Sequence, residues 1–229
     1  VYELRVVDAG AGMDEAIIDG GLTRLFASTK ADDRTMAGGF GIGFVSVFAW
    51  QPDAVVVHTG RAGEAWELTF YADKRFDKRA LAEPWKGTTV TLLRRGRAHE
   101  RAQIAEAVRD SLWRWCRFCR LELSFEDVAG GEGPELIQDA PAPPGALAVV
   151  DEAGDGAVHV AFAVPPEAVM LRRGLVLAQG PAADLLADLA PAPGRTLEHL
   201  QVWADSPGLR TTMARDKVVE DEGRAAVLG

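Results

Sequence analysis

Long apolar runs and basic charge are both scarce in this 229-residue sequence. No window approaches the roughly 18 consecutive apolar residues of a membrane span, and no basic and then apolar leader opens the chain. We therefore expect a cytoplasmic protein without membrane contact. The formal net charge of -9 argues against a surface built to hold nucleic acid, because such surfaces normally carry a basic excess.

Cysteines are scarce as well, and the only two, Cys116 and Cys119, form a single C-x-x-C motif. Common zinc sites need four ligands, and the sequence has no second C-x-x-C and no H-x-x-x-H. The pair continues the helical spacing of Ile104, Val108 and Leu112. This spacing favours two reduced thiols in or beside a core, and it leaves a redox role open.

The composition that is present is that of a globular protein, with 48% hydrophobic and 26% charged residues, which argues against disorder. A stretch rich in glycine and proline at 128–145 is expected to link a first domain, 1–127, to a second, 146–229. Helices combined with antiparallel strands predict an α+β fold, built as a two-layer sandwich with one helical layer. Strands are expected at 1–8, 54–59, 65–71, 88–93, 121–127, 158–164, 168–178 and 200–204, and helices at 14–25, 41–50, 98–119, 182–189 and from Thr212 past Val219.

Two glycine-containing motifs stand one helix length apart in the first domain. Asp8-Ala9-Gly10-Ala11-Gly12-Met13 places a carboxylate at the end of an apolar strand, followed by glycines where a side chain would block a ligand. Gly38-Gly39-Phe40-Gly41-Ile42-Gly43-Phe44 opens a predicted helix, whose N–H groups suit phosphate. The second motif matches neither G-x-G-x-x-G nor Walker A. Together the motifs predict a nucleotide pocket divided between two loops.

A third motif, Gly87-Thr88-x-Val90-x-Leu92, follows in order, and the three together resemble the ATP-binding signature of the GHKL superfamily. Within it, the sequence is most similar to the ninety-kilodalton heat-shock chaperones of the HtpG group. The resemblance implies a GHKL (Bergerat) type sandwich with bound ATP and a lid at 22–37. It implies that Asp8 accepts a hydrogen bond from the adenine amino group and that Thr88 joins Asp8. The remaining pocket residues would line the adenine or hold the phosphates: Gly10, Gly12, Met13, Gly39, Phe40, Gly41, Ile42, Gly43 and Phe44.

Each of these roles has a plainer alternative. Asp8 is suited to cap the helix that starts nearby, Met13 to fill a core, and Thr88 to serve as an ordinary strand residue. A cluster of glycines on its own is also typical of a hinge. The combination of three motifs in order favours the nucleotide pocket.

The sequence departs from the family pattern at several points. Ala9 replaces the usual asparagine of Asp-Asn-Gly, and Gly21 stands where an amide side chain often begins the lid. In the family, the catalytic glutamate and the asparagine that holds Mg²⁺ precede the first motif. Because the chain opens at Val1 inside a predicted strand, we expect it to be a fragment of a longer ATPase. The fragment contains neither of these two residues. Glu3 lies on the wrong element to replace the base, and Mg²⁺ is expected from the family alone.

The second half resembles the start of the chaperone's middle domain, a partial α/β domain. Asp205-Ser206 ends a predicted strand, and Arg215 matches the arginine that reaches the γ-phosphate, with Arg210 as the alternative. An arginine beside Asp216 is also typical of a solvated charge pair. The resemblance implies ATP-driven closure of the lid and the domains during protein folding, with client proteins and a second copy in a homodimer as partners. A DNA-repair or topoisomerase-type GHKL ATPase and a non-hydrolysing ATP-binding interaction module remain as alternatives.

Overall fold

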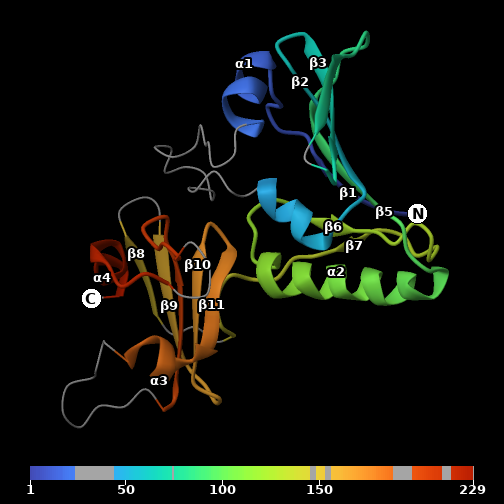
Figure 1. The fold of residues 1–229 in the computed structure, drawn as a ribbon. Helices are drawn as coiled ribbons and strands as arrows, with labels where there is room; N and C mark the ends of the chain where they lie inside the picture. Colours follow the sequence, from blue (N-terminus) through green and yellow to red (C-terminus); the bar gives the residue numbers. More distant parts are fainter. Residues whose placement is uncertain are drawn as a thin grey trace. The chain divides into compact units, whose positions relative to one another are not determined.

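The computed structural model describes residues 1–23, 44–73, 75–144, 148–152, 156–187, 198–212 and 218–228. The fold is mixed α+β, with mostly antiparallel strands and few helices, so the general fold class expected from the sequence is confirmed. The chain divides into two compact units, Val1–Arg101 and Ala102–Gly229, each with its own five-stranded sheet (Figure 1). The sequence placed the end of the first domain at 127, whereas the structure groups 102–127 with the second unit.

The first unit contains an antiparallel sheet with the strand order β1-β5-β2-β3-β4. Its strands are β1 (Tyr2–Asp8), β2 (Ala54–Arg61), β3 (Glu64–Tyr71), β4 (Phe76–Ala80) and β5 (Gly87–Arg94), and its helical segments are α1 (Glu15–Ile17), the π-helix η1 (Ile18–Leu22) and the 3-10 helices η2 (Phe44–Trp50) and η3 (Ala98–Glu100). The sequence did not predict β4, because Asp77, Lys78 and Arg79 interrupt its apolar alternation.

One face of this sheet carries the core of the first unit, covered by α1, η1 and η2 (Figure 1). The alternation of β2 turns Val55 and Val57 into that core, where they meet Ile18 of η1. The expected helix at 14–25 is wrong in part: Asp14 caps α1 by accepting from the Ile17 N–H at 2.9 Å, but the α-helical turns end there and continue as a π-helix. Gly20 and Gly21 lie in that π-helix, and glycine weakens a regular α-helix.

The second unit contains a mixed sheet with the strand order β11-β10-β12-β9-β8, in which β10 and β12 run parallel and the other neighbours antiparallel. Its elements are α2 (Arg101–Cys116), the short pair β6 (Ser124–Phe125) and β7 (Glu135–Leu136), then β8 (Ala148–Glu152), β9 (Gly156–Phe162), β10 (Glu167–Arg172), β11 (Leu175–Pro181), α3 (Ala182–Leu185), β12 (Leu200–Asp205) and α4 (Glu222–Leu228).

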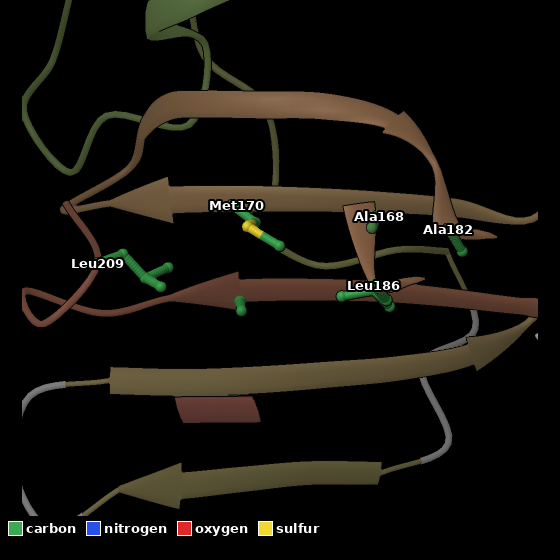
Figure 2. Close-up of a cluster of buried hydrophobic side chains, with 6 residues drawn as sticks. Ala168, Met170, Ala182, Leu186 and Leu209 are labelled. Atoms are coloured by element: carbon green, nitrogen blue, oxygen red, sulfur yellow. The ribbon is translucent and has the colours of Figure 1, made fainter. Parts of the chain in front are cut away.

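Both faces of this second sheet are buried. Figure 2 shows Ala168 and Met170 of β10 with Ala182, Leu186 and Leu209 gathered around them on one face. The alternate residues of β10 and β12 point to the other face, where they form a cluster that is closed by a residue from the segment after α2. Its members are Phe118, Val169, Leu171, Val176 and Trp203.

Three expectations for the second half are corrected by the structure. The strand expected at 168–178 is a hairpin, because Arg173 and Gly174 have φ of 55° and 77° and make a two-residue turn between β10 and β11. The helix expected from Thr212 is also wrong at its described ends, since Thr211 pairs with Val218 in an antiparallel bridge and α4 begins only at Glu222. The strand expected at 121–127 is reduced to the two residues of β6.

The helices in the part of the chain that the structure describes are too short or too polar to cross a membrane.

Candidate functional site

The ends of strands β1, β5, β2 and β3 bring four residues into one row on the core-facing side of the first sheet. Asp8 ends β1 and lies directly opposite Thr88 of β5. Thr88 also pairs with Thr59 of β2, and Thr59 pairs with Trp66 of β3. Because alternate residues of a strand share a face, this row lies on the same side as the buried Val57. The register therefore brings together Asp8 and Thr88, which the sequence had assigned to one pocket.

Thr59 fastens the loop that follows β1 to this row. Its side chain is 0% exposed, and its hydroxyl oxygen accepts a hydrogen bond from the Met13 N–H at 2.9 Å. The same oxygen lies 3.2 Å from the Gly87 carbonyl oxygen and 3.2 Å from the Thr88 hydroxyl oxygen. One hydroxyl proton can serve only one of these two acceptors at a time. Thr59 thus links the first and third motifs through buried hydrogen bonds.

Gly12 and Gly87 let the loop after β1 lie directly on the backbone of the strand ends, and Gly60 lets the segment before β5 approach β2. Gly12 has φ of 66°, and a Cβ there would lie 2.0 Å from the Gly60 carbonyl oxygen. Gly87 has φ of 78°, and its Cβ would lie 2.1 Å from the Asp8 carbonyl oxygen. A Cβ on Gly60 would lie 2.2 Å from the Trp85 carbonyl oxygen. Since these contacts are to backbone atoms, any side chain here would displace the loop or a strand.

Asp8 is exposed, and its Oδ1 accepts a hydrogen bond from the Gly10 N–H at 2.8 Å. A Cβ on Gly10 would lie 2.7 Å from that same oxygen, so glycine leaves room for the carboxylate in this turn. Among the described strands, β1 lies at the edge of its sheet and pairs with β5 on one side. The Asp8 carboxylate is therefore open to a hydrogen-bond donor from outside the chain.

Met13 and Phe44 both contribute to the core of the first unit. Met13 packs against the cluster that contains Ile18 and Val55, while its N–H is held by Thr59. Phe44 opens η2, and its ring centroid lies 5.0 Å from that of Phe70. The core role that the sequence left open for Met13 is thus present.

Several residues expected at the site lie outside the described ranges, together with residues 24–37 of the expected lid. They are Gly39, Phe40, Gly41, Ile42, Gly43 and Arg215. Arg210, the alternative to Arg215, lies within those ranges, and its Nε donates to Asp221 Oδ2 at 2.9 Å. Partial burial raises the pKa of Asp221, but hydrogen bonds from the Arg224 N–H and from Arg210 outweigh burial and lower the pKa overall.

Asp205, the aspartate of the Asp-Ser motif in the second half, is buried and fully engaged within its own unit. Its Oδ1 accepts from the Arg173 N–H at 2.6 Å and its Oδ2 from the Gly174 N–H at 3.0 Å. The Arg120 guanidinium lies 3.5 Å from Oδ2. Asp205 is 7% exposed, and it holds the β10–β11 turn in place.

Sequence reasoning missed Thr59 and Gly60. A usable pattern was present, because alternation from Val55 and Val57 places Thr59 on the buried face. A polar residue at a core position of a strand needs a hydrogen-bond partner, and here the partners come from two other motifs. Gly60 could be recognised only from the approach of Gly12, which involves residues distant in the sequence.

The opposite face of the first sheet carries a charged group. Glu67 of β3 lies 2.8 Å from the His58 Nε2 of β2 and 2.8 Å from the Arg79 Nε of β4. The hydrogen bond from Arg79 lowers the pKa of Glu67, partial burial opposes this effect, and the contact with His58 adds to the lowering. The His58 ring also stacks on Trp85 with centroids 5.0 Å apart. This group ties the three strands together behind the site.

Among the residues that the structure describes, there is no cluster of three or more His, Cys, Asp or Glu residues that could hold a metal ion. A pocket of about 210 Å³ lies in the second unit, lined by Arg114, Trp115, Val176 and Gln179. It contains none of the residues expected to bind a nucleotide.

A scan against models of known protein families found no match to this chain, and a search of curated protein sequences found none either.

Proposed function

We propose that the first unit binds ATP through its adenine ring at the row formed by Asp8, Thr88 and Thr59, in a GHKL-type sandwich. The proposal extends to an ATP-driven chaperone similar to the HtpG group. The observation that carries it is the register of β1 and β5, which pairs Asp8 with Thr88. Two residues from motifs eighty positions apart in the sequence thereby lie side by side at one end of the sheet.

Adenine recognition follows from the chemistry of an exposed carboxylate beside a threonine. The adenine 6-amino group is a donor, and a carboxylate is an acceptor only, so the two are complementary. Guanine and hypoxanthine carry an oxygen at that position, which would face the Asp8 carboxylate acceptor to acceptor. Within the described ranges Asp8 bonds only the Gly10 N–H, so its second oxygen has capacity for a ligand.

The loop after β1 supports this role because contacts with β2 and β5 hold it in place. The Met13 N–H is held by the buried Thr59, and Gly12 rests on the backbone at Gly60 and Gly87. A loop that is already fixed loses little conformational entropy when an adenine ring binds against it. The same contacts keep Asp8 and Gly10 in register with Thr88.

The phosphate half of the proposal rests on the resemblance. Residues Gly39–Phe44 would hold the phosphates through backbone N–H groups, and residues 22–37 would close as a lid. Arg215 would sense the γ-phosphate. ATP would then bias the lid and domain closure that act on client proteins in a homodimer. The acidic net charge favours this chaperone role over a DNA-repair or topoisomerase role.

Mg²⁺ accompanies ATP in the family, and in this proposal it rests on the resemblance alone. The described residues offer a single carboxylate, Asp8, at the row, and no cluster of metal ligands. Oxygen ligands are what Mg²⁺ requires, usually alongside phosphate oxygens. The proposal is accordingly one of nucleotide binding, and no step is assigned to a metal.

The experiment is calorimetric titration of the full chain with ADP. We expect Asp8→Asn to weaken binding about 10- to 150-fold, since a hydrogen bond to a charged group contributes about 1.5–3 kcal/mol. The matched control is Asp110→Asn, at an exposed position of α2, which should leave the affinity unchanged. Thermal melting of both variants checks that the fold is retained. Equal affinity of the wild type and Asp8→Asn would refute the assignment of the base contact.

A further inference from the structure

The C-x-x-C motif lies in a tight turn at the end of α2. Helix α2 ends at Cys116, and the Cys119 N–H donates to the Cys116 carbonyl oxygen at 2.9 Å. A turn closed in this way holds the Cα atoms of its first and last residues within about 7 Å. Disulfides form between Cα atoms about 4.4–6.8 Å apart. The backbone therefore presents the two cysteines at a separation suited to a disulfide.

The two thiols also interact with each other. A side-chain hydrogen bond from Cys119 lowers the pKa of Cys116 from its usual value to about 7, although burial opposes the shift. The same hydrogen bond raises the pKa of Cys119, and burial and the charge of Asp205 raise it further. Both cysteines are free and only half-buried. The pair is thus polarised: the pKa of Cys116 is lowered and that of Cys119 is raised, so Cys116 is the thiol that ionises first.

The turn is anchored on both sides, so the thiols cannot easily separate. Phe118, between the cysteines, is 2% exposed and its ring centroid lies 4.9 Å from that of Trp203. A Cβ on Gly174 would lie 2.0 Å from the Phe118 carbonyl oxygen, which shows how closely the turn abuts the β10–β11 hairpin. Asp205 binds the N–H groups of that hairpin turn and lies 3.5 Å from Arg120.

The segment that carries the pair is rich in arginine. Arg114, Arg117 and Arg120 flank the pair on its own segment, and Arg173 lies on the neighbouring turn. The Arg117 Nη2 donates to Gln179 of β11 at 3.2 Å. Arg114 and Trp115, which precede Cys116 in the chain, line the pocket of about 210 Å³, and neither cysteine is among its lining residues. Asp205 is the carboxylate that faces the pair from β12. Positive charge attracts small disulfides that carry carboxylates, such as oxidised glutathione.

We propose that Cys116 and Cys119 are a thiol–disulfide exchange site for small anionic disulfides of the glutathione type. The Cys116 thiolate attacks one sulfur of the small disulfide, forms a mixed disulfide and releases one small thiolate. The Cys119 sulfur then attacks the Cys116 sulfur of the mixed disulfide, and its proton passes to the second small thiolate as that leaves. The two cysteines are oxidised together, and one small disulfide is reduced to two thiols.

This exchange differs from that of dedicated thiol oxidoreductases because the motif ends a helix. The C-terminal end of a helix carries partial negative charge, which opposes the Cys116 thiolate, but the hydrogen bond from Cys119 outweighs this effect and lowers the pKa of Cys116. The disulfide would close the turn from Cys116 to Cys119, which lies against the β10–β11 hairpin at Gly174. The oxidation of this pair is therefore a reversible modification of the second unit. The proposal does not depend on nucleotide binding by the first unit.

The test treats the full chain with oxidised glutathione, blocks remaining thiols with iodoacetamide and measures mass. We expect a monomer that has lost two hydrogen atoms, carries no alkyl group at Cys116 or Cys119, and returns to two alkylated thiols after reduced glutathione is added. Cys119→Ser should instead accumulate glutathione on Cys116. Cys116→Ser should react at least about tenfold more slowly, because the remaining thiol is protonated.

The pH dependence provides a second readout. The alkylation rate of Cys116 should rise through a midpoint near pH 7, in line with its lowered pKa of about 7. The proposal is overturned if the wild type keeps both thiols alkylatable, stops at the mixed disulfide, or forms only intermolecular dimers. The wild-type arms need no variant, so a failure of either serine variant to fold leaves the test intact.

Discussion

Asp8 and Asp205 each end a β-strand, and each is followed within three residues by a glycine, yet the two units use these aspartates in opposite ways. Asp205 is buried and accepts two backbone N–H groups of the β10–β11 turn. Asp8 is exposed and accepts only the Gly10 N–H within the described ranges. Asp8 can therefore accept a further hydrogen bond from a ligand, whereas both carboxylate oxygens of Asp205 already accept hydrogen bonds within the fold.

This difference comes from the sheet position rather than from the local sequence. β12 is a central strand with β10 and β9 on either side, so its end is surrounded. β1 is at the edge of its sheet, so its end is open. An aspartate at the end of a strand is therefore available to a ligand when the strand is at the edge of its sheet, and the sequence alone does not give the strand order.

The largest effect should come from Asp205→Ala. One buried and one partly buried backbone N–H group would lose their acceptor, at a cost of about 1–3 kcal/mol each, so the second unit should lose about 3 kcal/mol of its free energy of unfolding. Asp8→Ala should cost less than about 1 kcal/mol, since its single hydrogen bond is exposed. Hydrogen exchange measured by mass spectrometry reports each unit separately. Similar losses in both units would contradict the comparison.

A second experiment asks how firmly the loop beneath Asp8 is held, using Gly12→Ala. This residue has φ of 66° and would place its Cβ 2.0 Å from the Gly60 carbonyl oxygen. Gly63→Ala is the matched control, because Gly63 also has a positive φ, of 90°, but a Cβ added there would meet no atom within 4 Å. The control should cost about 1–2 kcal/mol from backbone strain alone. Gly12→Ala should cost at least about 2 kcal/mol more in urea unfolding. If the two variants are equally stable, the close approach is unimportant.

Thr59→Val sharpens the comparison further by removing the hydroxyl that holds the Met13 N–H. We expect a loss of about 1–2 kcal/mol in the free energy of unfolding, because the buried N–H is left without an acceptor. Thr59→Ser keeps the hydroxyl and should retain most of the stability. ADP affinity should fall with valine and stay near the wild-type value with serine. If Thr59→Val binds ADP as tightly as the wild type, the loop does not need the hydrogen bond from Met13 to Thr59 for nucleotide binding.

The smallest effect concerns pH. The pKa of Glu67 in the first unit and that of Asp221 in the second are both lowered in the folded state. A lowered pKa contributes stability above the unfolded-state value, ordinarily 4.5 and 3.8, and this contribution is lost as pH falls through the folded-state pKa. Each contribution should be below about 1 kcal/mol. Glu67→Gln and Asp221→Asn should each flatten the acid side of the stability profile of their own unit; a profile unchanged by both variants would contradict the assignment.

The sequence predicts the elements whose apolar residues alternate, and it predicts Asp8 and Thr88 on strands, but it misses Thr59 and Gly60 of β2. Val55 and Val57 mark β2, and Thr88 follows from β5. The sequence did not predict β4, where charged residues interrupt the alternation, and it joined β10 and β11 into one strand although Arg172-Arg173-Gly174 separates their apolar residues. The contacts among Gly12, Gly60 and Gly87 depend on strand register, which no local pattern contains.

The central claim is that the Asp8 carboxylate recognises the amino group of adenine. Titration of the wild type and Asp8→Asn with ADP and with inosine diphosphate, which carries an oxygen in place of that amino group, tests it most directly. The wild type should prefer ADP by at least about tenfold, the equivalent of about 1.4 kcal/mol, and the preference should disappear in Asp8→Asn. A wild type that binds the two nucleotides equally, or a preference that survives in Asp8→Asn, would contradict the account.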